Sequence, residues 1–189
     1  MTLEPRLRFN VDRYVAMHEK GIIPEDMRVE LLDGEIIQMS PIGSRHAFLV
    51  ARLHELLYIA VHKTCLIYDQ NPLELSDKSM PQPDLMVLRK SKKYLDALPI
   101  PNDVLLLIEV SDSSARYDRQ EKLPRYAEAG LTEVWLVDAE QSTVEQYTSP
   151  LTDRYANLVI HQLQQTISSH NLPELKLALT EIFESAEGT

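Results

Sequence analysis

The feature that most constrains the fold of this chain is an unbroken apolar run, residues 104–108, that ends on Glu109. A strand that is apolar at every position must be covered on both faces, which is typical of a central strand. Residues 134–137 have the same character. A carboxylate at the end of such a strand is costly to bury unless it is paired or bound to a cation. The run therefore predicts a covered sheet with a charged site at its edge.

Periodicity and turn residues predict an α/β fold, a mixed sheet flanked by helices. Helices are predicted from the Asn10 cap through 14–19, over 44–62, over about 117–128 and near 179–183. Strands are predicted at 28–32, 35–39, 64–70, 72–75, 84–88, 104–110, 133–137, 143–147 and 155–160, with a further segment near 175–177. Asp33-Gly34 joins the first two strands as a hairpin, because both residues tolerate positive φ.

Two helices carry further predictions. The apolar stripe of the long helix is expected to face the core, and it consists of Phe48, Ala51, Leu53, Leu56, Leu57, Ala60 and Val61. Pro124 lies inside the helix predicted over 117–128. Proline removes one backbone hydrogen bond, so we expect this helix to bend there.

Length and composition favour one domain, residues 1–189, in a cytoplasmic protein. A chain of 189 residues can bury a core without disulfides. Its single cysteine, Cys65, excludes a disulfide framework and a zinc ribbon, and its apolar surroundings predict a buried, inert thiol. No apolar stretch approaches the ~20 residues of a membrane span. The first residues lack the pattern of a signal peptide, and no membrane partner is expected.

Three residues form the candidate site. Asp84 opens one strand, Glu109 ends the central strand, and Lys122 lies on the following helix. Two carboxylates on adjacent strands repel one another unless a divalent ion lies between them, and Mg²⁺ suits such a pair. A nearby lysine can orient or deprotonate the attacking water, or neutralise charge in the transition state. This constellation predicts a metal-dependent site for phosphate ester chemistry.

The helix that carries the lysine shows a second pattern. Asp118, Lys122 and Tyr126 are spaced i, i+4, i+8 and so share one face. Asp118 can then hold Lys122 in place. The alternative is a solvated stripe of salt bridges. The position of this stripe directly after Glu109 favours the functional interpretation.

The ordered series of motifs resembles the Uma-type restriction endonuclease family of the PD-(D/E)XK nuclease superfamily. The motifs, in chain order, are Glu30-Leu31-Leu32-Asp33-Gly34, a helical His46, Pro83-Asp84, Ile108-Glu109-Val110-Ser111, Asp118…Lys122…Tyr126, Ala129-Gly130…Val134-Trp135-Leu136-Val137-Asp138 and Leu172-Pro173-Glu174-Leu175. No single motif is specific to this family. The ordered series of motifs is specific to it, and the series covers nearly the whole chain.

The resemblance implies a single PD-(D/E)XK nuclease-like domain with a restriction-endonuclease-like mixed sheet and an N-terminal hairpin. It also implies hydrolysis of DNA phosphodiester bonds with Mg²⁺, for which Mn²⁺ can substitute. Asp84 and Glu109 would be metal ligands and Glu30 an additional acid of the metal site. One departure stands out: the superfamily's usual lysine, two residues after the acid, is Ser111 here. The Uma-type pattern supplies that lysine from the next helix, which maps to Lys122.

Other residues allow two interpretations each. Glu30, taken alone, is typical of an exposed strand residue. His46 can contact phosphate or another helix, or it can serve as a structural cap or packing residue at the start of its own helix. Asp112 can reach the metal or cap the next helix, and Gln82 can touch the site. The only basic cluster in the sequence allows two interpretations, a contact with nucleic acid or a short solvated loop. Its members are Arg89, Lys90, Lys92 and Lys93.

Three functions remain open from the sequence. The first is a Mg²⁺-dependent endonuclease that acts on DNA. The second is a catalytically silent module for binding or assembly, which Ser111 and the net charge of −10 favour, since nucleic-acid binders are usually basic. The third is a hydrolase of another phosphate ester. A homodimer is expected for the first, because two sites suit cleavage of both strands of a duplex.

Overall fold

A six-stranded sheet forms the centre of the computed structural model, which describes residues 7–112 and 114–184. In sheet order the strands are β3 (Cys65–Asp69), β4 (Leu85–Arg89), β5 (Val104–Ser111), β6 (Glu133–Asp138), β7 (Thr143–Pro150) and β8 (Tyr155–His161). Neighbours are antiparallel except β5 and β6, which run parallel. The predicted mixed sheet is confirmed, and the apolar run at 104–108 forms an interior strand.

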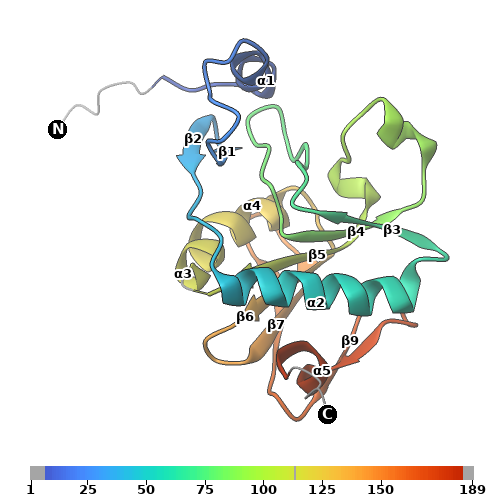
Figure 1. Ribbon diagram of the computed structural model, residues 1–189. Helices are drawn as coiled ribbons and strands as arrows, with labels where there is room; N and C mark the ends of the chain where they lie inside the picture. The colour runs from blue at the N-terminus through green and yellow to red at the C-terminus, as the bar shows by residue number, and fades with distance from the viewer. Residues whose placement is uncertain (1–6, 113, 185–189) are drawn as a thin grey trace.

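Helices and smaller sheets cover the two faces of this sheet (Figure 1). On one face lie α2 (Ser44–Val61), α5 (Leu179–Phe183) and a ribbon of β9 (Thr166–Ser168) with β10 (Lys176–Ala178). The α3–α4 crossover covers the other. An N-terminal unit of α1 (Val11–Glu19), β1 (Val29–Leu32) and β2 (Glu35–Gln38) lies at the top of the view. Two short 3₁₀ turns, η1 (Lys92–Leu95) and η2 (Pro101–Asp103), lie between β4 and β5. Within the described ranges, no helix is long and apolar enough to cross a bilayer.

The crossover between the parallel strands is broken into three pieces where one bent helix was predicted. They are α3 (Ala115–Tyr117), a π-helical turn η3 (Asp118–Lys122) and α4 (Leu123–Glu128). Pro124 explains the break, because it has no N–H and its ring clashes with the carbonyl group four residues earlier. The backbone widens instead, and the N–H of Leu123 bonds to the carbonyl of Asp118. Lys122 thus lies at the end of a wide turn, a feature frequent at functional sites.

The N-terminal hairpin turns at Asp33-Gly34, as predicted. Asp33 has φ 48° and Gly34 has φ 78°, which are the left-handed conformations that such turns require. A Cβ at Gly34 would lie 2.8 Å from the carbonyl oxygen of Phe9. The hairpin is therefore anchored to the preceding chain, and all four residues of β1 are buried.

The predicted strand at 72–75 is wrong. The N–H of Leu73 bonds to the carbonyl of Pro81 at 2.9 Å, and that of Leu75 bonds to Ser79 at 3.0 Å, but no strand forms. Pro72, Pro81 and Pro83 occur in this segment or opposite it. Because proline lacks an N–H, the segment cannot complete a ladder of hydrogen bonds.

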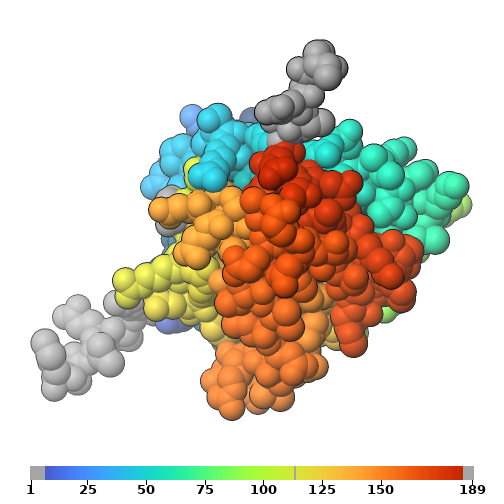
Figure 2. Space-filling view, turned by 90° about the horizontal axis from the view of Figure 1, so that it is seen from below, coloured from blue at the N-terminus to red at the C-terminus, as the bar shows by residue number. Residues whose placement is uncertain are grey.

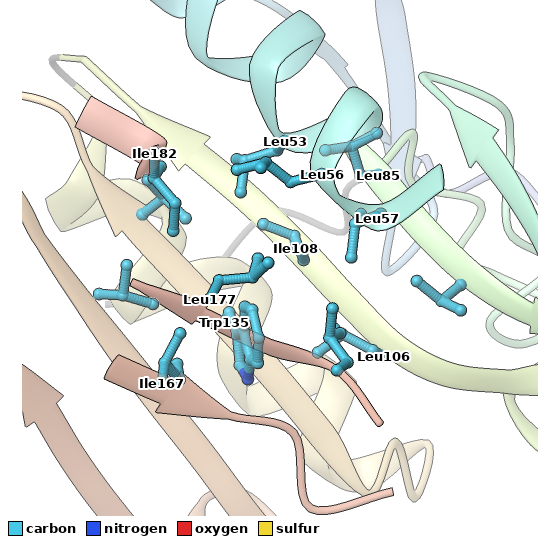
Figure 3. Close-up of a cluster of buried hydrophobic side chains, with 14 of the residues drawn as sticks. Leu53, Leu56, Leu57, Leu85, Leu106, Ile108, Trp135, Ile167, Leu177 and Ile182 are labelled. Atoms are coloured by element: carbon cyan, nitrogen blue, oxygen red, sulfur yellow. The ribbon is translucent and has the colours of Figure 1, made fainter. Parts of the chain in front are cut away.

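Both faces of β5 are buried, as its apolar run predicted. Leu106 and Ile108 pack towards α2 in the larger core cluster, together with Trp135 (Figure 3). Leu107 points to the opposite cluster, which contains Tyr126. The C-terminal elements close the larger cluster from below, where orange-to-red residues form much of the surface (Figure 2). Cys65 is buried in this cluster, in agreement with an inert thiol.

The apolar face of α2 differs in part from the predicted stripe. Phe48 is 46% exposed and Ala51 also faces outward, whereas Leu49 is buried. The buried side chains are Leu49, Leu53, Leu56, Leu57 and Val61. These residues are spaced about one helical turn apart, so they form the stripe that meets the sheet. Phe48 lies next to that stripe in the sequence but is exposed, and periodicity alone could not tell it apart from the buried Leu49.

The two faces of α2 can be separated by mutation. We expect Leu53→Ala, at a fully buried position, to cost about 2–5 kcal/mol because it leaves a cavity. For a chain of this size that lowers Tm by roughly 5–15 °C. Phe48→Ala on the outer face is the matched control and should cost less than about 1 kcal/mol. Thermal unfolding measures both; equal losses would contradict the assigned packing face.

Candidate functional site

A cleft of about 440 Å³ gathers the predicted site residues. Its walls come from the N-terminal hairpin, the start of α2, the facing ends of β4 and β5, and the crossover. The predicted residues that line it are Glu30, His46, Asp84, Glu109, Asp118 and Lys122. Segments that are far apart in the sequence thus meet at one edge of the sheet. Asp112 and Gln82, which the sequence left open, also line the cleft.

Lys122 is the buried cation of the cleft. Its Nζ lies 3.1 Å from Glu109 Oε1 and 3.3 Å from Glu30 Oε2, and only 5% of the residue is exposed. Burial on its own lowers the pKa of a lysine, but the surrounding carboxylates outweigh it and raise the pKa of Lys122. Glu109 and Glu30 contribute most to this rise. The side chain is therefore an ammonium group at neutral pH.

Glu109 is held from the crossover by two donors. The hydroxyl of Tyr126 donates to Glu109 Oε1 at 2.5 Å, alongside Lys122. Burial raises the pKa of Glu109, and Asp84 and Asp118 add to the rise, whereas Lys122 and Tyr126 oppose it. Additional positive charge in the cleft would stabilise the ionised carboxylate. Tyr126 itself is buried behind Glu109, outside the cleft lining.

Asp84 is fixed at the start of β4 by its neighbours. The backbone N–H of Val110 donates to Asp84 Oδ2 at 2.9 Å, and His46 Nε2 lies 3.0 Å from the same oxygen. Gln70 Nε2 approaches Oδ1 at 3.4 Å. The hydrogen bond to Asp84 raises the pKa of His46. His46 is therefore part of the site, oriented by a carboxylate of the site.

Asp118 supports the site without binding Lys122 directly. No ion pair within 4.0 Å joins Asp118 to Lys122 among the residues that the structure describes. Ser114 Oγ instead donates to Asp118 Oδ2 at 2.9 Å and lies 3.3 Å from Ser111 Oγ. The expected i, i+4 pair is thus replaced by pairing of Lys122 with acids on β1 and β5. The ammonium group of Lys122 is buried between two carboxylates, and both of them come from outside the crossover.

Glu30 lies on β1 inside the cleft and is 2% exposed, so its interpretation as an exposed strand residue is wrong. Besides Lys122, the backbone N–H of Gln82 approaches Glu30 Oε2 at 3.4 Å. Its role as a metal ligand stays a prediction. In this geometry its clearest contact is the ion pair with Lys122.

The donor chemistry of the cleft suits a divalent cation. Within residues 7–112 and 114–184, no three His, Cys, Asp or Glu side chains form a ready-made metal cage. Mg²⁺ does not require one, because it is commonly held by one or two carboxylates and takes its other ligands from water and phosphate. Asp84 and Glu109 are such a pair, on neighbouring strands and facing one cleft. The residues therefore fit Mg²⁺ as two ligands.

The sequence analysis and the structure differ on which residues line the cleft. The basic cluster at 89–93 is outside the cleft lining, with Lys93 paired to Asp103 and Lys90 bound to the carbonyl of Lys63. Arg28 and Tyr117 line the cleft but were missed. Burial, with a smaller contribution from Glu30, raises the pKa of Tyr117 to about 12, so its hydroxyl stays neutral. Neither residue lies in a recognisable motif.

Comparison with known proteins identifies a family and a similar fold. A family model described as "Putative restriction endonuclease" matches residues 11–180. Among solved structures, the chain is similar to a putative nuclease belonging to DUF820 from Anabaena variabilis ATCC 29413, with a TM-score of 0.72. That match has 16% sequence identity and covers 93% of this chain and 97% of the other, and at such identity it shows the fold alone. Comparison with curated proteins gives no match.

The family match spans most of the chain and includes every predicted site residue. The structure brings the acids and the lysine among these residues together at one cleft. The chain therefore belongs to the Uma2 family, whose description is "Putative restriction endonuclease".

Proposed function

We propose that the protein is a metal-dependent endonuclease that hydrolyses phosphodiester bonds of DNA, with Mg²⁺ as its cation and Mn²⁺ as a substitute. The observation that carries this proposal is the ammonium group of Lys122, held between Glu109 and Glu30 in a cleft that Asp84 also lines. Family membership and the similar fold support a nuclease. The cation, the DNA substrate and the roles of the residues go beyond that family membership and are proposed from the cleft.

Asp84 and Glu109 are proposed to hold the cation. The hydrogen bonds from Val110 to Asp84 and from Tyr126 to Glu109 restrain both carboxylates before any ligand arrives. Such restraint reduces the reorganisation that binding would otherwise require. When bound, a divalent cation supplies Lewis-acid stabilisation of the negative charge that develops on the phosphoryl oxygens.

Lys122 is proposed to donate hydrogen bonds and to stabilise negative charge in the transition state. Its raised pKa keeps the side chain protonated, which disfavours a role as the base that deprotonates water. Glu30 and Glu109 position the ammonium group, and Tyr126 positions Glu109. Lys122 then performs from the crossover the task that the superfamily's lysine performs two residues after the acid.

A second candidate is a catalytically silent binding module. Ser111 occupies the usual lysine position, and its hydroxyl contacts Ser114 instead of the acids of the cleft. The net charge of −10 also weakens attraction to DNA. A hydrolase of another phosphate ester is the third candidate. Measurements of cleavage and of metal binding separate the three.

Plasmid cleavage with Mg²⁺ or Mn²⁺ tests the activity. We expect the wild type to cleave, and Glu109→Gln and Lys122→Met each to lower the rate by at least about 100-fold, because the first removes a ligand of the cation and the second removes the ammonium group. Asp138→Asn is the matched control: it neutralises another buried acid at a strand end, which lies outside the cleft lining and pairs with Arg119.

The variants need a check on folding, because Lys122→Met leaves buried carboxylates unpaired at a cost of about 3–5 kcal/mol. Thermal unfolding of each variant provides it, and Glu109→Gln keeps the size of the side chain. Absence of cleavage above the variants' background, on DNA and RNA, would favour the silent module. Hydrolysis of a small phosphodiester with plasmid DNA intact would favour the third candidate.

Metal binding has its own readout in the thermal stability. Mg²⁺ at about 100 times its Kd should stabilise the fold by about 2.7 kcal/mol, which raises Tm by roughly 5–10 °C. We expect Asp84→Asn to abolish this rise because it removes one of two charged ligands, and Asp138→Asn to preserve it. A wild-type Tm that Mg²⁺ and Mn²⁺ leave unchanged would contradict the proposed metal site.

We propose that two copies associate, as suits cleavage of both strands. The exposed edge strand β8 supports this, because Leu158, Val159 and Ile160 are each about half exposed and Tyr155–His161 contains no Asp, Glu, Lys or Arg. Unprotected edges of this kind pair readily with another strand. Light scattering should give twice the chain mass of 21.7 kDa, and Val159→Lys should give monomer. A wild-type monomer mass would refute the dimer.

A further inference from the structure

One cation of the cleft takes no part in the network around Lys122. Arg28 directly precedes β1 and is half-buried in the lining. Its Nη1 donates to the carbonyl oxygen of Ser40 at 3.2 Å, which fixes the guanidinium on the loop that leads to α2. This bond uses one of the five N–H donors of an arginine. The other donors have no hydrogen-bond partner among the described residues.

The absence of an ion pair at Arg28 is unusual for this location. The cleft is lined by Glu30, Asp84, Glu109, Asp112 and Asp118. Across the described ranges, none of their oxygens lies within 4.0 Å of the Arg28 nitrogens. A partly buried charge without a counterion is costly, and an anion entering the cleft would remove that cost. The guanidinium is therefore held apart from the acids and remains able to bind an anion.

Arg28 is bound to the loop that leads to α2, and Asp112 also approaches this loop: its Oδ2 lies 3.5 Å from the position that a Cβ on Gly43 would take. Gly43, which precedes α2, also lines the cleft, and the first turn of α2 contains no acid. Carboxylates thus line the cleft from β1, β4, β5 and Asp112, whereas Arg28 adds a guanidinium that is bound to the loop 39–43. A nucleic-acid strand carries successive phosphates, so one can lie at the cation held by the acids and another at Arg28.

We propose that Arg28 binds a backbone phosphate of the nucleic-acid substrate and so positions the strand across the cleft. This inference rests on the proposed nuclease function and assigns a binding residue to it. The fork of N–H groups in arginine matches two phosphate oxygens at once, which a lysine cannot reproduce. Such a contact explains how a chain with a net charge of −10 engages a polyanion at an acidic cleft.

Binding of a fluorescent DNA duplex, measured by anisotropy in EDTA at low salt, tests the proposal without catalysis. We expect Arg28→Gln to raise Kd about ten-fold or more, because it removes a charge-assisted hydrogen bond to phosphate. Arg28→Lys should recover part of the loss. The slope of log Kd against log salt should fall by about 1 for Arg28→Gln, as expected for one lost phosphate contact.

Arg13→Gln is the matched control. It removes the same charge from an exposed arginine on α1, outside the cleft lining, and should leave Kd and the salt slope unchanged. In Mg²⁺, Arg28→Gln should raise the KM of cleavage more than it lowers kcat. Arg28→Lys, which keeps the charge, guards against a loss caused by misfolding of Arg28→Gln.

The outcomes separate this inference from the function on which it rests. Equal Kd and salt slope for wild type and Arg28→Gln would overturn the phosphate contact, even if the wild type cleaves DNA. Equal losses in Arg28→Gln and Arg13→Gln would overturn it as well, and so would a wild type that binds no duplex at low salt. Binding that depends on Arg28 in a protein that never cleaves would uphold the contact and refute the hydrolysis.

Discussion

The buried ion pairs of Lys122 hold the architecture of the cleft together. Lys122 comes from the crossover, Glu109 from the central strand and Glu30 from the N-terminal hairpin, so one ammonium group joins three segments of the chain. A lysine buried this deeply is stable only among carboxylates, and those carboxylates in turn require its charge. The hairpin is therefore joined to the sheet edge by electrostatics, whereas its apolar residues Val29 and Leu31 pack with Tyr14 of α1 in a separate core cluster.

The π-helical turn explains how a lysine from the crossover reaches the central strand. Pro124 prevents a regular helix, and the widened turn at Asp118–Lys122 ends on the lysine. Four residues on, Tyr126 belongs to regular helix and donates to the same oxygen of Glu109 that Lys122 contacts. Ser114 donates to Asp118 and lies beside the hydroxyl of Ser111, so these two serines hold Asp118 in place. The widened turn and the regular helix after it thus bring Lys122 and Tyr126 to the same carboxylate.

Charge in the cleft is divided in space. Lys122 pairs with Glu109 and Glu30, while Arg28, which precedes β1, is bound to the loop before α2. Two residues of the exposed basic cluster at 89–93 make local contacts: Lys93 pairs with Asp103, and Lys90 donates to the carbonyl of Lys63, which follows α2. An acidic protein can therefore present a small, separate site for an anion beside its acids. This division is consistent with a substrate that carries successive phosphates, and with a cation that links the acids to one of them.

Local patterns in the sequence were sufficient for the covered central strand, the turn at Asp33-Gly34 and the residues worth testing as a site, because burial and turn conformation follow from neighbouring residues. They failed at 72–75, where prolines in the partner segment prevent a strand, and at Phe48, where packing selects between adjacent helix faces. Only the tertiary structure paired Lys122 with Glu109 and Glu30 instead of Asp118, and only it placed Arg28 in the cleft without a counterion. Periodicity reports which side chains are buried, but the partner of a buried charge depends on segments brought together by the whole fold.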